Sequence, residues 1–177
     1  MQFSVSEALC KAGKRPHDIF MISLGGQLLL GPTAIFLQIG TVALLLPLGF
    51  SLLFFLWSLW QIRQPAIADN WFVATHWRLA LRRYRLLYIG YGITTLFFVA
   101  ASLLALTIDP DSPQKFLPIA LDRIGVMPTL ILVLVTLVME NSALNMAQKG
   151  ELPDSCVKRY PPPPGVITLP AADASLP

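Results

Sequence analysis

RQPAIADNWFVATHWRLALRRYR, residues 63–85, is the long polar interruption in the first hundred residues of the chain. It holds five of the thirteen lysines and arginines, and uncharged apolar runs lie on both sides of it. Charged residues make up only 13% of the sequence, about half of the share usual in soluble domains. So few charges would leave the surface of a soluble fold uncovered. The composition therefore predicts an all-α polytopic membrane protein, with residues 63–85 as a basic, amphipathic cytoplasmic connector.

The first apolar run, residues 19–62, contains no charged side chain over 44 positions. One membrane crossing needs about 20 apolar residues, so this run is long enough for a transmembrane hairpin. The turn is expected at residues 38–41, the least apolar spot near the middle, and Pro47 is expected to kink the second helix. The alternative is a break at Gly31-Pro32, because proline cannot continue the helical hydrogen-bond ladder. That break would give three crossings plus an N-terminal interfacial or re-entrant helix.

Residues 1–18 form a polar N-terminal segment, in which a short helix can begin near Ser6. Gly13 and Pro16 are expected to end that helix. A basic start before an apolar run is also the layout of a secretory signal. Here the apolar run is far longer than the core of a signal, so the segment is expected to remain uncleaved.

The connector is predicted to form a helix that lies along the headgroup layer and can run directly into the next crossing. Asp69 or Asn70 can cap its first turn. Aromatic and apolar side chains share one helical face, and arginines share the neighbouring face. Such a helix suits guanidinium groups that contact lipid phosphates and rings that lie at the hydrocarbon edge. The residues predicted to dock lipid headgroups or a partner are Trp77, Arg78, Arg82, Arg83 and Arg85.

The second half of the chain is predicted to hold two more crossings, residues 86–107 and 124–143, joined by an external loop at residues 108–123. Prolines at 110, 113 and 118 are expected to prevent a helix in this loop, whereas Pro128 falls near the start of the last crossing. Small residues spaced four apart let a neighbouring helix approach closely. The residues predicted for such packing are Gly90, Thr94, Ala101 and Ala105.

The C-terminal tail, residues 144–177, is polar and proline-rich, and we expect it to be largely disordered. Four consecutive prolines at 161–164 favour an extended polyproline II conformation. An extended segment of this kind can also serve as a ligand for a partner. The prediction for the tail is therefore an unstructured cytoplasmic arm.

The distribution of basic residues predicts the orientation. With four crossings, the N-terminal segment, the connector and the tail carry 11 of the 13 lysines and arginines, and the external loop carries two. This arrangement follows the positive-inside rule, whereas three crossings would place eight inside and five outside. We therefore expect four crossings of an inner (cytoplasmic) membrane with both termini cytoplasmic. Cys10 and Cys156 would then be reduced.

No catalytic motif, phosphate-binding loop or HExxH sequence occurs in the chain, so neither enzymatic activity nor a cofactor is expected. His17 and His76 lie about sixty residues apart, and Cys10 with His17 is the nearest approach to a metal-ligand spacing. No metal site is predicted. Gly25-Gly26 is interpreted as a close helix contact or a bend.

Glu140 is the one ionisable residue that can reach into the membrane from a predicted crossing. Such groups often mark a transport pathway or an ion pair. Because Glu140 lies toward the end of its helix, an interfacial position is expected. The alternative is a buried polar contact with an arginine of another subunit.

These features favour a non-catalytic integral membrane subunit or scaffold of a larger inner-membrane assembly, as in bacterial secretion, conjugation or envelope complexes. The alternative is a small oligomeric transporter or channel, in which Glu140 would be essential. The expected partners are membrane lipids and other membrane proteins or further copies of the chain. Lipid and orientation explain the connector arginines, so nucleic acid is not expected, and no small-molecule substrate is evident.

Overall fold

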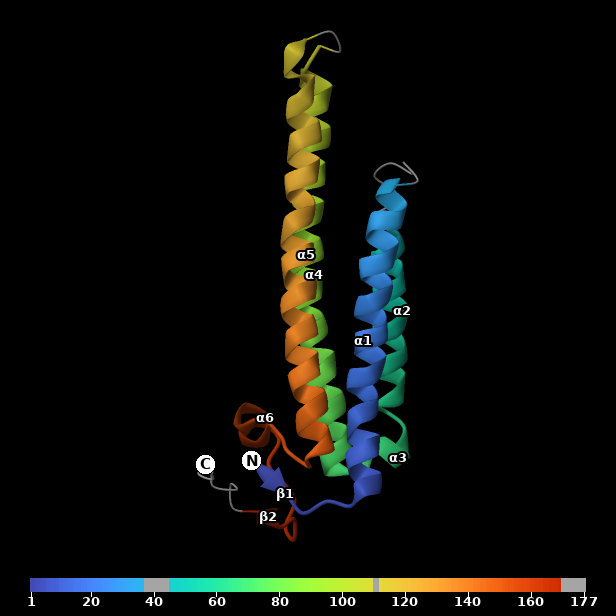
Figure 1. Ribbon diagram of the computed structural model, residues 1–177, viewed down its shortest axis with the longest axis vertical. Helices are drawn as coiled ribbons and strands as arrows, with labels where there is room; N and C mark the ends of the chain where they lie inside the picture. Colours follow the sequence, from blue (N-terminus) through green and yellow to red (C-terminus); the bar gives the residue numbers. More distant parts are fainter. Residues whose placement is uncertain (37–44, 110–111, 170–177) are drawn as a thin grey trace, which may run out of the picture.

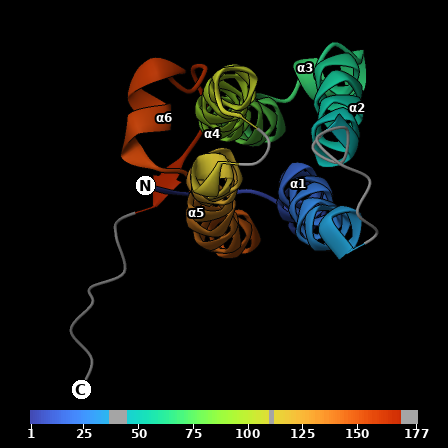
Figure 2. The same ribbon diagram turned by 90° about the horizontal axis from the view of Figure 1, so that it is seen from above.

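The computed structural model describes residues 1–36, 45–109 and 112–169. Within these residues the chain is built on two pairs of long helices. The first pair is α1 (Glu7–Phe36) and α2 (Leu45–Gln61), and the second is α4 (Trp71–Thr107) and α5 (Phe116–Gln148). Figure 1 shows the two pairs running side by side, and Figure 2 shows all four helices end-on as a bundle. The prediction of an all-α fold is confirmed.

The helices α4 and α5 are each long and apolar enough to cross a membrane, whereas α2 is apolar but has only 17 residues. At about 1.5 Å per residue, the 37 residues of α4 extend over roughly 55 Å. The hydrocarbon core of a bilayer is only about 30 Å thick. A crossing by α4 would therefore leave a substantial part of the helix outside the hydrocarbon layer. Four crossings remain a prediction.

The short elements are α3 (Pro65–Ala68), η2 (Pro113–Lys115), α6 (Asp154–Arg159) and the strands β1 (Gln2–Phe3) and β2 (Thr168–Leu169). The two strands pair antiparallel, with Phe3 opposite Thr168. Both strands lie with α6 at the same end of the bundle as α3 (Figure 1). We call this end the base, comprising residues 1–20, 63–85 and 139–169. The remaining described residues form the shafts.

A compact apolar cluster closes the base. Its buried members come from β1, the first half of α1, the start of α4 and the segment around α6, and they are Phe3, Ile19, Phe72, Val73, Trp77, Leu152 and Val157. The prediction of a largely disordered tail is therefore wrong for the residues up to 169 that are described. Although the tail is polar on average, Leu152 and Val157 are enough to anchor it, because they pack in the apolar cluster of the base. The prolines at 161–164 lie outside helices and strands, as expected.

The prediction that Gly13 and Pro16 end the first helix is also wrong. The helix α1 begins at Glu7 and continues through both residues, past Gly31-Pro32, to Phe36. Packing against α4 compensates for the poor helix propensity here. A Cβ at Gly13 would lie 2.9 Å from a ring carbon of Phe72, so glycine is what permits this close approach. The turn predicted at residues 38–41 lies outside the described residues.

Three other prolines occupy positions within their helices that differ from the predicted ones. Pro47 falls in the first turn of α2, where a missing N–H is tolerated, so it is not a mid-helix kink. Pro118 falls in the first turn of α5 for the same reason, and the predicted loop therefore ends earlier, at η2. Pro128 lies inside α5 rather than near its start. Asn70 caps α4 by accepting a hydrogen bond from the Val73 amide at 3.1 Å, as one of the two predicted caps.

Candidate functional site: a buried chain of Arg83, Glu140, His17 and His76

Glu140 lies on α5 inside the base and is fully buried, with 0% of its surface exposed. Its Oε1 accepts a hydrogen bond from Nη1 of Arg83 at 2.8 Å. Its Oε2 lies 2.6 Å from Nδ1 of His17. Both carboxylate oxygens are therefore held by side chains of the same chain. Glu140 is therefore buried within the protein, and the arginine that it contacts belongs to this chain rather than to another subunit; its interfacial depth stays a prediction.

The contacts continue from His17 to a second histidine. Nε2 of His17 lies 2.9 Å from Nδ1 of His76, and both rings are fully buried. With both rings neutral and Glu140 ionised, one placement of protons satisfies these contacts. His17 donates from Nδ1 to Glu140, and His76 donates from Nδ1 to Nε2 of His17. The charges of Arg83 and Glu140 then cancel within the chain of contacts.

The four side chains come from three helices. His17 lies on α1 and Glu140 on α5, whereas His76 and Arg83 lie on α4, seven residues apart and hence on the same helical face. Nη1 of Arg83 also donates to the carbonyl of Met139 at 2.8 Å. The contacts therefore tie α1, α4 and α5 together over about two turns of α4.

Two nitrogens of this cluster make no hydrogen bond within the described residues. One is Nε2 of His76, although the backbone of Glu151 lies near the ring. The other is Nε of Arg83, which is buried beside Met139. An unsatisfied N–H of a guanidinium group is costly to bury. The Arg83 end of the cluster therefore retains an unused donor.

The arrangement is that of a buried ion pair extended by two imidazoles. Breaking such a pair costs several kcal/mol, because one charge is then left buried without its partner. Among the residues that the structure describes, no three histidine, cysteine, aspartate or glutamate side chains are grouped so as to hold a metal ion. The chemistry available to the cluster is hydrogen bonding and proton exchange between its members.

The predicted docking residues of the connector separate into two groups. Arg78, Arg82 and Arg85 are exposed on one side of α4. Trp77 and Arg83, with 1% and 8% exposed, lie inside the base and are not part of the exposed face of α4, although Arg83 reaches the wall of a cavity. All five residues lie on one predicted helix. The sequence does not show which face of that helix α1 and α5 cover.

The exposed arginines border two cavities at the base. One cavity, of about 240 Å³, lies between α2, α4 and Tyr160, and Arg78 contacts the Tyr160 ring at 4.8 Å from its centroid. The other, of about 520 Å³, lies between α4, α5 and the segment that leads into α6. Arg82 and Arg85 line both cavities, and Arg83 lines the larger one.

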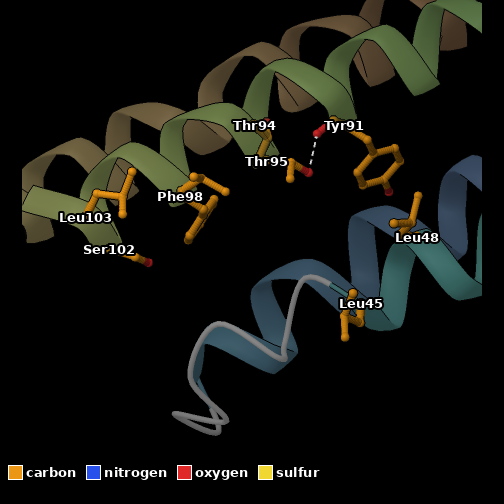
Figure 3. Close-up of a pocket in the computed structure, with 9 residues that line it drawn as sticks. Leu45, Leu48, Tyr91, Thr94, Thr95, Phe98, Ser102 and Leu103 are labelled. Atoms are coloured by element: carbon orange, nitrogen blue, oxygen red, sulfur yellow. Dashed lines mark hydrogen bonds between the residues drawn. The ribbon is translucent and has the colours of Figure 1, made fainter.

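A third cavity lies among the shafts, between α4 and the start of α2 (Figure 3). It encloses about 310 Å³ and is mostly apolar. Tyr91 lies at its edge and donates a hydrogen bond to Gln27 on α1 at 2.9 Å. The Thr95 hydroxyl lies on the same side and donates to the Tyr91 carbonyl at 2.8 Å (Figure 3).

The small residues predicted for helix packing lie on α4. Gly90 and Thr94 face α5: a Cβ at Gly90 would lie 3.2 Å from the Cα of Thr129, and the hydroxyls of Thr94 and Thr129 are 2.7 Å apart. Ala101 is buried, whereas Ala105 is exposed. Gly26 of the Gly25-Gly26 pair meets the ring of Phe50 on α2, and so marks a close helix contact.

Sequence reasoning missed His17 and His76 as members of one cluster. The available signal was the spacing of His76 and Arg83, which share a face of α4. The placement of His17 depends on how α1 docks, which the sequence does not specify. The chain matches no protein-family model, and searches of curated proteins and of solved structures found no match.

Proposed function

We propose that this chain is a non-catalytic integral membrane subunit or scaffold of a larger inner-membrane assembly, crossing the membrane four times with both termini in the cytoplasm. The observation that carries the proposal is the state of Glu140. A carrier would need this carboxylate free to meet its cargo. Here both oxygens are held, by Arg83 and His17, and the side chain is fully buried. This arrangement favours a structural role, in which Glu140 joins neighbouring helices, over a role as a transport site.

The base supports the proposed orientation. It brings the N-terminal segment, the connector and the start of the tail together at one end of the bundle (Figure 1). These segments carry 11 of the 13 lysines and arginines, and the other two lie in the segment predicted to be external. An excess of this kind favours the cytoplasmic side.

The shafts supply surface for lipid or for other membrane proteins. Large apolar side chains are exposed along α4 and α5, among them Leu96 at 68%, Leu106 at 83% and Val138 at 71%. Extended apolar surfaces of this kind are uncommon on soluble monomers and mark sites of membrane or protein contact. Such faces suit a subunit that packs against neighbours within the bilayer.

The experiment that tests the proposal is affinity purification of a tagged full-length chain from its native host, in a gentle detergent or in nanodiscs, followed by mass spectrometry. We expect a stoichiometric set of membrane proteins to be recovered. Recovery of the chain alone, as a defined homo-oligomer, would count against a subunit and would favour the transporter or channel.

A variant distinguishes the two functions further. Glu140→Gln should abolish flux if the chain is a carrier, whereas in a scaffold it should at most weaken assembly. Glu7→Gln is the matched control, because Glu7 is an exposed carboxylate on α1. Loss of solute flux in Glu140→Gln with a normal set of partners would contradict the proposal.

A further inference from the structure

The larger cavity of the base combines charge with an apolar wall. Its basic side is formed by Arg82, Arg83 and Arg85, and its apolar side by Leu79, Leu86 and Met139. Its volume of about 520 Å³ is in the range of sites for small ligands. We infer that this cavity binds the phosphate group of an acidic phospholipid, with the acyl chains passing along the apolar wall toward the shafts.

The first support is the unused donor of Arg83. This side chain is nine-tenths buried and lines the cavity, and its Nη1 already serves Glu140 and Met139. Its Nε has no hydrogen-bond partner within the described part of the chain, but this atom is itself buried, so the guanidinium group must turn toward the cavity to donate from Nε to a ligand. A phosphate oxygen is a strong acceptor for a guanidinium group, and such charge-assisted bonds are about twice as strong as neutral ones.

The second support is the positive charge that is left without compensation. Glu140 is engaged by Arg83 and His17, and no ion pair joins Arg82 or Arg85 to a carboxylate of the described residues. Cys156, on α6, lies close to the same arginines. Burial raises the pKa of its thiol, and the charges of Arg82, Arg83 and Arg159 act in the opposite direction. The cavity therefore lies in a region of positive potential, which attracts an anion.

The third support is the position of the cavity along α4, and here the inference rests on the proposed function. The arginines end at Arg85, and the uncharged run that would cross the membrane begins at Leu86. With the base on the cytoplasmic side, the arginines lie at headgroup depth and Leu86 at the hydrocarbon edge. A soluble phosphate would use the basic side alone, whereas a lipid uses both sides.

The test uses the purified full-length chain in a neutral detergent, without partners, and native mass spectrometry to count bound lipid. The probes are phosphatidylglycerol, phosphatidylcholine and inorganic phosphate. We expect one phosphatidylglycerol to bind per chain in preference to phosphatidylcholine, and millimolar inorganic phosphate not to displace it. Because partners are absent, failure of this test would leave the purification experiment above unaffected.

Two sets of variants locate the site without breaking the contact with Glu140. Arg82→Gln with Arg85→Gln removes two exposed charges and should weaken phosphatidylglycerol binding about thirtyfold, from the typical worth of a basic residue near anionic lipid. Ser155 is exposed at the cavity, so Ser155→Glu should weaken binding about fivefold through charge repulsion. Ser155→Gln is the control of similar size and should bind like the unaltered chain.

The outcomes are separable. Equal binding of phosphatidylglycerol and phosphatidylcholine, or affinities that none of these variants changes, would overturn the site. Displacement of the lipid by inorganic phosphate would overturn the lipid as the source of the phosphate group. Unfolding temperatures of the variants should match that of the unaltered chain, since all the substituted residues are exposed.

Discussion

The base and the shafts are held together by different chemistry. In the base, segments distant in sequence share an apolar cluster and a buried ion pair extended by His17 and His76. In the shafts, α4 and α5 meet through a glycine and a pair of threonine hydroxyls, while large apolar side chains point outward. The pairing of charged and polar side chains therefore matters most in the base, and side-chain size matters most in the shafts.

The largest effect is expected from breaking the ion pair of the base. Glu140→Leu would leave Arg83 buried without a counter-charge and His17 without its acceptor. Loss of one partner of a buried pair typically costs about 3–5 kcal/mol. We expect the free energy of unfolding in detergent to fall by about that amount, as measured by denaturant titration of the purified chain.

The control for this prediction is the double variant Arg83→Met with Glu140→Leu. It removes both charges, so its loss of stability should be clearly smaller than the sum of the two single losses. A second control is Lys14→Gln, because the Lys14–Asp18 pair is solvent-accessible, with 3.9 Å between the charged atoms. Such a pair contributes about 0.5 kcal/mol or less. Additive single losses would mean that Arg83 and Glu140 do not act as a pair.

A smaller effect is expected from overpacking the shafts. At Gly90 even a Cβ would lie 3.2 Å from the Thr129 backbone and from Leu132, so Gly90→Leu should push α4 away from α5. Overpacking of this kind typically costs about 1–3 kcal/mol. Gly92→Leu is the matched control two residues away, because nothing lies within 4 Å of its added Cβ. Equal stabilities of the two variants would contradict the packing role of Gly90.

The same division explains what the sequence could predict. Long uncharged runs predict helices whatever their neighbours, so the helical class and the apolar character of α4 and α5 follow from the sequence. The Asn70 cap depends only on residues within one helical turn, so the sequence predicts it as well. The cluster of the base is not local, since His17 lies 59 residues from His76 and 123 from Glu140. Periodicity holds no information about which helices meet at such separations.

The predictions that proved wrong failed for the same physical reason, which is that contacts between distant segments outweigh local preferences. Gly13 and Pro16 have low intrinsic helix propensity, but the contact of α1 with Phe72 of α4 outweighs this local preference. The tail is polar on average, yet Leu152 and Val157 complete the apolar cluster of the base. Arg83 and Arg82 are neighbours in sequence, and only the packing of α5 against α4 decides that one is buried and the other exposed.

The smallest effect concerns the closure of the base by its strands and tail. Gly150 follows α5 with a φ of +70°, and an added Cβ would lie 3.0 Å from the Phe3 carbonyl and 2.9 Å from Val5. Gly165 has a φ of +95°, but nothing lies within 4 Å of its added Cβ. An alanine in a left-handed conformation costs about 1–2 kcal/mol, so both variants should be destabilised.

Gly150→Ala should be the worse of this pair, because its Cβ also displaces the segment that carries Phe3. The readout is the rate of maleimide labelling of Cys156 in a Cys10→Ser background. Cys156 is buried next to Val157, and burial raises the pKa of its thiol, so the closed base should react slowly at neutral pH. Faster labelling in Gly150→Ala than in Gly165→Ala would show that Phe3 seals the base. Equal rates in the two variants would mean that only backbone strain matters, and that the strand pairing does not protect this core.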